Sequence, residues 1–186
     1  MDYSKLTIKA LEYAALNHKG DVRKGTATPY IVHPVEVAMI LKESSLSEEI
    51  VAAGMLHDIL EDTDVRPEEI KSEFGEEILR LVLGASEKLE NRDDRSWRTR
   101  KEHTVNYLKD EADFKIKLIA CADKLSNARS TLRDLETEDP EEFWSRFNAG
   151  KEEQKWYYQS LVESLKELDG MKMYNEFKEI VNRYIF

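Results

Sequence analysis

The chain of 186 residues contains one cysteine, Cys121, only four prolines and only seven glycines. A single cysteine cannot form an internal disulfide or supply the ligands of a zinc ribbon, so both kinds of cross-linked domain are excluded. We expect Cys121 to pack as a small apolar residue of a helix. A chain of this length can bury one hydrophobic core without such cross-links.

Long hydrophobic runs are also missing. No apolar stretch approaches the roughly 20 residues that a membrane-spanning helix requires. The first residues, Met-Asp-Tyr-Ser-Lys, do not have the pattern of a secretion signal. The sequence therefore predicts a cytoplasmic protein with no membrane partner.

Basic residues are outnumbered, with 28 Lys and Arg against 38 Asp and Glu and a net charge of −10. This surplus disfavours sequence-independent binding to nucleic acid or to an anionic membrane. A small anionic ligand is still compatible with it, because a metal ion and a few local cations can reverse the sign of the potential in one cleft.

Strand patterns are absent as well. No alternating apolar–polar run is bounded by Asn-Gly or Asp-Gly turns, and there is no repeat or low-complexity tract. Apolar residues instead recur at helical spacing along nearly the whole chain. We therefore expect an all-α fold, with residues 1–186 forming a single domain and the helices of 140–186 completing the bundle.

The helix boundaries follow from apolar stripes and from helix-breaking residues. One helix is predicted to end near His57-Asp58. Other helices are predicted at about 67–74, 97–108, 112–135, 151–168 and 172–185, with an exposed polar loop at 86–96.

Two ionisable pairs, His57-Asp58 and Glu61-Asp62, are spaced one helical turn apart in a segment that is otherwise apolar. Three carboxylates and an imidazole beside a core face are costly to desolvate unless a cation neutralises them. The sequence therefore predicts that these two pairs belong to a functional site.

His33 stands in a turn just before a helix, and Asp123 is a charge within the apolar part of the long helix. With His57 and Asp58, they offer two imidazoles and two carboxylates. This set suits an octahedral ion such as Mn²⁺, with Fe²⁺, Zn²⁺, Co²⁺ and Mg²⁺ as alternatives. Taken singly, each residue fits a structural role, such as pairing of Asp123 with Lys124 or Arg129. The joint pattern favours a metal site.

Five motifs carry a resemblance to a known family. They are Arg23-Lys24, Thr28-Pro-Tyr-Ile-Val-His-Pro34, His57-Asp-Ile-Leu-Glu-Asp-Thr63, Phe74-Gly75 and Asp123-Lys-Leu-Ser-Asn-Ala-Arg129. In order and spacing, the chain resembles the HD-domain metal-dependent phosphohydrolases. Within that superfamily it is most similar to the hydrolase domain of RelA/SpoT proteins, in its stand-alone form. The resemblance covers about residues 5–135.

The resemblance implies an HD-type helical bundle that hydrolyses (p)ppGpp to GDP or GTP by removing the 3′-pyrophosphate. It implies Mn²⁺ held by His33, His57, Asp58 and Asp123. It also implies that Glu61 and Asp62 act on the attacking water. Further roles implied by the resemblance are substrate contacts from Arg23, Lys24, Asn127 and Ser130.

The chain departs from the family pattern at Ser86-Glu-Lys88, where relatives usually carry Val-Thr-Lys, so Lys88 would have to retain that role. Arg129 is open to two interpretations, as a cation for the substrate or as a brace for a carboxylate of the site. Lys155 and Tyr158, in the C-terminal aromatic-basic helix, could contact substrate or pack inward.

Three competing functions remain open at this stage. They are an HD phosphohydrolase for another nucleotide, such as a 5′-nucleotidase, a non-catalytic nucleotide sensor, and a purely structural scaffold. Subunit assembly is not derivable from the sequence.

Overall fold

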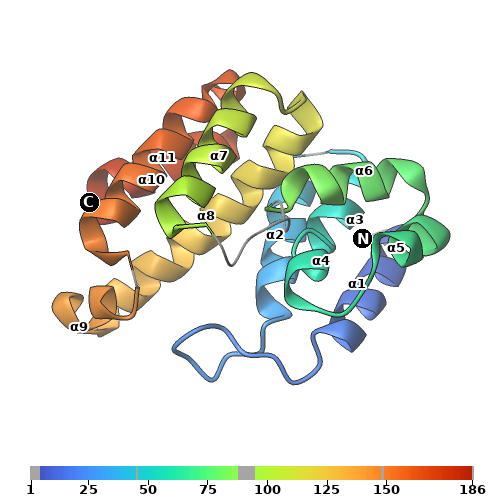
Figure 1. Cartoon of the computed structure of the whole chain (residues 1–186), viewed down its shortest axis with the longest axis horizontal. Helices are drawn as coiled ribbons and strands as arrows, with labels where there is room; N and C mark the ends of the chain where they lie inside the picture. The colour runs from blue at the N-terminus through green and yellow to red at the C-terminus, as the bar shows by residue number, and fades with distance from the viewer. Residues whose placement is uncertain (1–4, 45, 88–94, 148, 186) are drawn as a thin grey trace. The chain divides into compact units, whose positions relative to one another are not determined.

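The computed structural model describes residues 5–44, 46–87, 95–147 and 149–185, and these residues are predominantly helical (Figure 1). The only extended pairing among them is an isolated antiparallel bridge between Val22 and Pro29. The all-α prediction is therefore confirmed. No helix within the described ranges is both long and apolar enough to cross a membrane.

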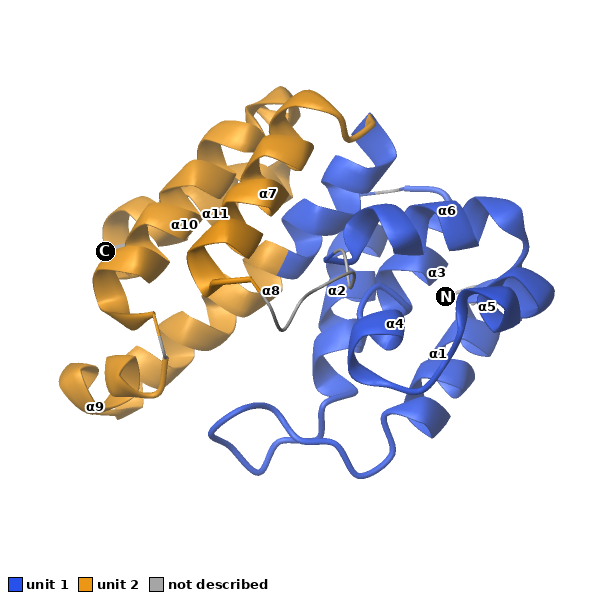
Figure 2. Ribbon diagram, in the orientation of Figure 1, with its two compact units in different colours: residues 1–87, 114–123 blue, residues 88–113, 124–186 orange. Residues whose placement is uncertain are grey.

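The described residues fall into two compact units (Figure 2). The first contains the chain up to Glu87 together with Phe114–Asp123, and the second contains the remainder. That all 186 residues act as a single domain stays a prediction.

The first unit contains six helices and the start of a seventh. They are α1 (Lys5–Asn17), α2 (Val32–Glu43), α3 (Glu48–Met55), α4 (Ile59–Asp62), α5 (Pro67–Phe74), α6 (Glu76–Ala85) and the beginning of α8 (Phe114–Thr137). The predicted short helix at 67–74 is confirmed. It begins at a proline, which has no N–H to leave unpaired, and ends at Gly75, whose φ of 89° is open to glycine.

Helix α3 forms the core of this unit, because it packs against α1, α2 and α6 and all its residues from Ile50 to Met55 are buried. Because Gly54 has no side chain, α2 can pack close to α3 at this position. A Cβ atom at this position would overlap Leu41 Cδ1 and lie 3.4 Å from Val37 Cγ1.

The observed end of this helix is close to the predicted end near His57-Asp58. Helix α3 ends at Met55, a turn occupies Leu56–Asp58, and α4 begins at Ile59. In a continuous helix the Gly54 carbonyl would accept the Asp58 N–H. Here it accepts His57 Nδ1–H instead, at 2.8 Å. The side chain of a site residue thus replaces a backbone hydrogen bond and ends the helix.

The second unit contains α7 (Trp97–Asp110), the rest of α8, α9 (Pro140–Ser145), α10 (Gly150–Ser164) and α11 (Lys172–Ile180). The 3₁₀ turn Lys166–Leu168 follows α10, and the π-helical turn Val181–Ile185 follows α11. Helix α10 packs against α7, and Tyr157 is buried while Tyr158 contacts the ring of Phe177. These two aromatic residues therefore pack inward.

Most of the predicted loop at 86–96, including Lys88, lies outside the described residues. Cys121 is buried in α8, and its burial raises the pKa of the thiol to about 12. The thiol is therefore protonated at neutral pH, which agrees with its predicted role as an apolar packing residue.

Candidate metal centre

His57 is the best-defined member of the candidate site. It follows α3, and its side chain is 2% exposed. A carbonyl oxygen can only accept, so the hydrogen bond to Gly54 fixes the proton on Nδ1. The other nitrogen, Nε2, is buried and has no hydrogen-bond partner in the described part of the chain.

Two carboxylates face this nitrogen. Asp58 Oδ1 lies 3.0 Å from His57 Nε2, and Asp123 Oδ1 lies 3.6 Å from it. A lone pair pointing at carboxylate oxygens is repulsive, unless a proton or a metal ion stands between them.

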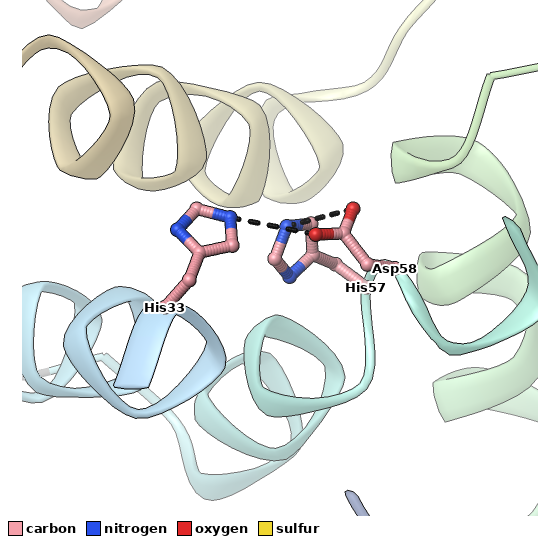
Figure 3. Close-up of side chains that lie close together, drawn as sticks. All are labelled: His33, His57 and Asp58. Atoms are coloured by element: carbon pink, nitrogen blue, oxygen red, sulfur yellow. Dashed lines mark ion pairs between the residues drawn. The ribbon is translucent and has the colours of Figure 1, made fainter. Parts of the chain in front are cut away.

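His33 enters from the first turn of α2, and its side chain is also 2% exposed. Its Nε2 lies 3.2 Å from Asp123 Oδ1 and 3.4 Å from Asp58 Oδ2. Figure 3 shows the two imidazole rings and the Asp58 carboxylate close together. Their nearest ligand atoms all lie within 4.8 Å of one another.

The four residues thus come from three separated segments of the first unit: the start of α2, the turn after α3, and the first half of α8. Asp123 was open to pairing with Lys124 or Arg129, and the structure places both imidazoles beside its carboxylate. The structure thus brings the four predicted residues close together.

Electrostatics in this cluster are strongly perturbed. Burial alone would lower the pKa of His57, but the nearby carboxylates of Asp58 and Asp123 raise it well above 6.5. Burial alone would raise the pKa of Asp58, yet His57 and His33 hold it well below its usual range. The ion-free site therefore favours a proton on His57.

These observations fit a divalent cation. A histidine that ligates a metal typically donates its other ring N–H to a backbone carbonyl, as His57 does to Gly54. The orphaned Nε2 and the convergent carboxylates supply nitrogen and oxygen donors of the type that Mn²⁺ and related ions accept.

Glu61 and Asp62 follow in α4, and Glu61 is half-buried while Asp62 is exposed. Glu61 Oε1 accepts the Glu87 N–H at 2.6 Å. Next to it, Ser86 Oγ donates to the His57 carbonyl at 2.9 Å. The segment after α6 therefore holds both the histidine backbone and the Glu61 side chain.

Arg23 and Lys24 lie in the irregular segment between α1 and α2. The Arg23 guanidinium lies 5.8 Å from the centre of the Tyr30 ring. Lys24 is exposed. Both cations are thus carried by the segment that leads into His33.

The remaining predicted contacts, Asn127 and Ser130, lie further along α8 in the second unit, and both are half-buried. Arg129 was expected to meet substrate or a carboxylate of the site. It instead donates from Nε and Nη2 to the two carboxylate oxygens of Glu176, at 2.7 and 2.9 Å. This bidentate pair joins α8 to α11 within the second unit.

Sequence reasoning missed Tyr30 as a part of the site. Its hydroxyl donates to Asp58 Oδ2 at 2.6 Å. Burial, followed by the charge of Asp58, raises the pKa of Tyr30 far above its ordinary value of 10.0, and nearby Asp62 adds to this. The phenol therefore stays protonated as a donor. The one available signal was its position three residues before His33.

A protein-family model described as HD domain matches residues 10–147. The chain belongs to the HD-domain family.

Two curated relatives are named for the same activity. The guanosine-3′,5′-bis(diphosphate) 3′-pyrophosphohydrolase of Borreliella burgdorferi is 38% identical over 125 residues, which is 66% of this chain but only 18% of that protein. The chain thus spans less than a fifth of that relative's length. The enzyme named guanosine-3′,5′-bis(diphosphate) 3′-pyrophosphohydrolase MESH1 from Danio rerio is 36% identical over 137 residues, which cover 72% of this chain and 71% of the relative.

Two solved structures are also similar to this chain. A metazoan ortholog of SpoT, described as hydrolysing ppGpp, superposes with a TM-score of 0.79 at 26% identity, covering 97% of this chain and 96% of the other. The lmo0812 protein of Listeria monocytogenes EGD-e superposes with a TM-score of 0.73 at 32% identity, covering 87% and 100%. The resemblance to stand-alone RelA/SpoT-type hydrolases is therefore confirmed.

Proposed function

We propose that this protein is a metal-dependent phosphohydrolase, a guanosine-3′,5′-bis(diphosphate) 3′-pyrophosphohydrolase that converts (p)ppGpp to GDP or GTP and pyrophosphate. The observation that carries the proposal is the buried His57 Nε2, which faces two carboxylates without a hydrogen-bond partner among the described residues. The relatives named above supply the substrate class.

The proposed cofactor is one Mn²⁺ ion held by His33, His57, Asp58 and Asp123. When bound, such an ion acidifies a water molecule and polarises a phosphoryl oxygen. The choice of Mn²⁺ over other divalent ions rests on the mixed nitrogen and oxygen donor set and on the family resemblance.

Glu61 and Asp62 are the proposed catalytic residues, which act on the attacking water. The reaction requires attack of a water oxygen on the phosphorus bonded to the ribose 3′ oxygen, and cleavage of that phosphorus–oxygen bond. The water must lose a proton, and the leaving 3′ oxygen must gain one. Because Glu61 Oε1 is held by the Glu87 N–H, we assign Glu61 to orienting the water and the exposed Asp62 to accepting its proton.

Arg23 and Lys24 are the proposed contacts for the anionic nucleotide, with Asn127 and Ser130 as further contacts. The net charge of −10 repels such a ligand at long range, so these local cations are required to offset it. We further propose a single-domain protein acting in the cytoplasm on a small nucleotide, with no nucleic acid partner.

Phosphorus-31 NMR of the products tests this function. The Mn²⁺-loaded protein is incubated with ppGpp and, separately, with a panel of nucleoside monophosphates. We expect GDP and pyrophosphate from ppGpp, and no phosphate from the monophosphates. Inorganic phosphate without pyrophosphate would contradict the assigned substrate and favour an HD 5′-nucleotidase. Nucleotide binding without any product would favour a sensor.

A further inference from the structure

Tyr30 contacts a proposed metal ligand directly. Its hydroxyl donates to Asp58 Oδ2 at 2.6 Å, a short bond of the kind that a charged acceptor makes. The contact joins residues 28 positions apart, so it depends on the conformation of the segment between α1 and α2.

This segment fixes the position of the tyrosine. The Tyr30 N–H donates to the Asp21 carbonyl at 2.9 Å, and the Tyr30 carbonyl accepts the His33 N–H at 2.9 Å. The ring lies against that of His18, with 4.8 Å between ring centroids and an angle of 34°. His18 itself is buried. The phenol is therefore held both by its own backbone and by a buried neighbour.

The two oxygens of Asp58 have different surroundings. Oδ1 lies 3.0 Å from the His57 Nε2, whereas Oδ2 accepts from Tyr30 and lies 3.4 Å from the His33 Nε2. A carboxylate without a second anchor can rotate about its terminal bond. The tyrosine hydroxyl prevents this rotation and thus fixes the oxygen that faces His57.

We propose that Tyr30 is a positioning residue of the metal centre, which orients the Asp58 carboxylate through its hydroxyl group. This inference rests on the proposed function only in its metal site, not in its substrate. Hydrogen-bond partners of ligating carboxylates typically change metal affinity 10- to 100-fold when they are removed.

The test is the substitution Tyr30→Phe, which removes only the hydroxyl group. Mn²⁺ affinity is measured by electron paramagnetic resonance of the free ion, and hydrolysis is followed over a range of Mn²⁺ concentrations. We expect a dissociation constant for Mn²⁺ roughly 10- to 100-fold higher, and recovery of the rate at high Mn²⁺. Such recovery would not follow from a purely structural role.

Tyr13→Phe is the matched control, because Tyr13 belongs to the same unit and packs edge-on against Phe74. It should leave Mn²⁺ affinity unchanged. An unchanged Mn²⁺ affinity in Tyr30→Phe would overturn the inference. Failure of Tyr30→Phe to fold would also overturn it, because the hydroxyl would then serve the fold.

The same titration separates this inference from the proposed function. If the unsubstituted protein binds Mn²⁺ and Tyr30→Phe weakens that binding, the role of Tyr30 stands even if ppGpp is not hydrolysed. If the unsubstituted protein binds no Mn²⁺, both the inference and the proposed metal centre are overturned.

Discussion

The two nitrogen atoms of the His57 ring have different roles. Its Nδ1–H replaces a helical hydrogen bond at Gly54, which ends α3, and its Nε2 faces Asp58 and Asp123. The turn that ends α3 therefore also directs Nε2 of His57 toward the proposed metal site. Because Nε2 faces the proposed ion, binding of a metal ion depends on the protonation state of His57.

Mn²⁺ affinity should increase with pH. The pKa of His57 in the ion-free protein is raised well above 6.5, so its contribution to folding is fully present below pH 6.5 and is lost as pH rises through the raised value. A metal ion must displace this proton. Calorimetric titrations should therefore give a dissociation constant about tenfold lower at pH 7.5 than at pH 6.5, with about one proton released. A pH-independent constant would contradict the protonated ion-free site.

Loss of either acidic residue of α4 should slow hydrolysis without loss of the metal ion. We expect Asp62→Asn to lower kcat by roughly 10²- to 10⁴-fold, the usual contribution of a general acid or base. Glu61→Gln should also lower kcat, because it disturbs the group that orients the water. Glutamine keeps an oxygen that can accept the Glu87 N–H, so the local fold is preserved. Steady-state kinetics with ppGpp provide the measurement.

Glu68→Gln and Asp64→Asn are the matched controls, because both residues are exposed and close in sequence to the acidic pair. They should retain kcat within about twofold. Equal losses in these controls would assign the effect to general charge rather than to Glu61 and Asp62.

The proximity of the four proposed ligands could be predicted from their joint pattern, because buried imidazoles and carboxylates at these spacings have few structural explanations. Tyr30 could not, because its contact depends on a loop conformation that no periodic pattern encodes. The pairing of Arg129 could not be predicted for a similar reason. Its partner, Glu176, lies 47 residues away on another helix.

At the scale of helices, the packing of α3 decides where the site forms. This helix is buried along most of its length and contacts α1, α2 and α6. Its close approach to α2, which carries His33, depends on Gly54. The same residue supplies the carbonyl that anchors His57.

Gly54→Ala should therefore destabilise the protein. The new methyl group would overlap Leu41 Cδ1, and overpacking of a core usually costs about 1–3 kcal/mol. Urea denaturation measures the change in the free energy of unfolding. The double variant Gly54→Ala with Leu41→Ala should lose less than the sum of the two single losses, because shortening Leu41 removes the overlapping atom. Additive losses would contradict a direct clash.

Helix positions followed from sequence better than helix ends. The apolar stripes predicted the long helix at 112–135, which is observed as Phe114–Thr137. The break at Leu56–Asp58 could not be predicted, because it results from a side chain that competes for a backbone carbonyl.

For the whole molecule, an ion at this site should contribute directly to stability. Three segments of the first unit place charged or ionisable groups in a buried cluster, and a cation would offset their repulsion. The surplus of acidic residues across the chain adds to the unfavourable potential.

Saturating Mn²⁺ should raise the melting temperature of the protein. A ligand at 100 times its dissociation constant stabilises the native state by about 2.7 kcal/mol, which corresponds to a shift of roughly 5–11 °C for a chain of this size. Differential scanning calorimetry with and without Mn²⁺, after treatment with a chelator, measures the shift. An unchanged melting temperature would contradict a metal centre that joins these segments.

The central claim is that one divalent ion is held by residues from three separated segments, and Asp123 is the most distant of them in sequence. Electron paramagnetic resonance titration of Mn²⁺ into the protein and into Asp123→Asn tests this claim most directly, with Asp134→Asn on the same helix as control. We predict one ion per chain in the unsubstituted protein and in the control. Binding in Asp123→Asn should be weaker by at least the roughly 10- to 100-fold that loss of a ligand's hydrogen-bond partner costs. No bound ion in the unsubstituted protein, or equal affinity in Asp123→Asn, would contradict the account.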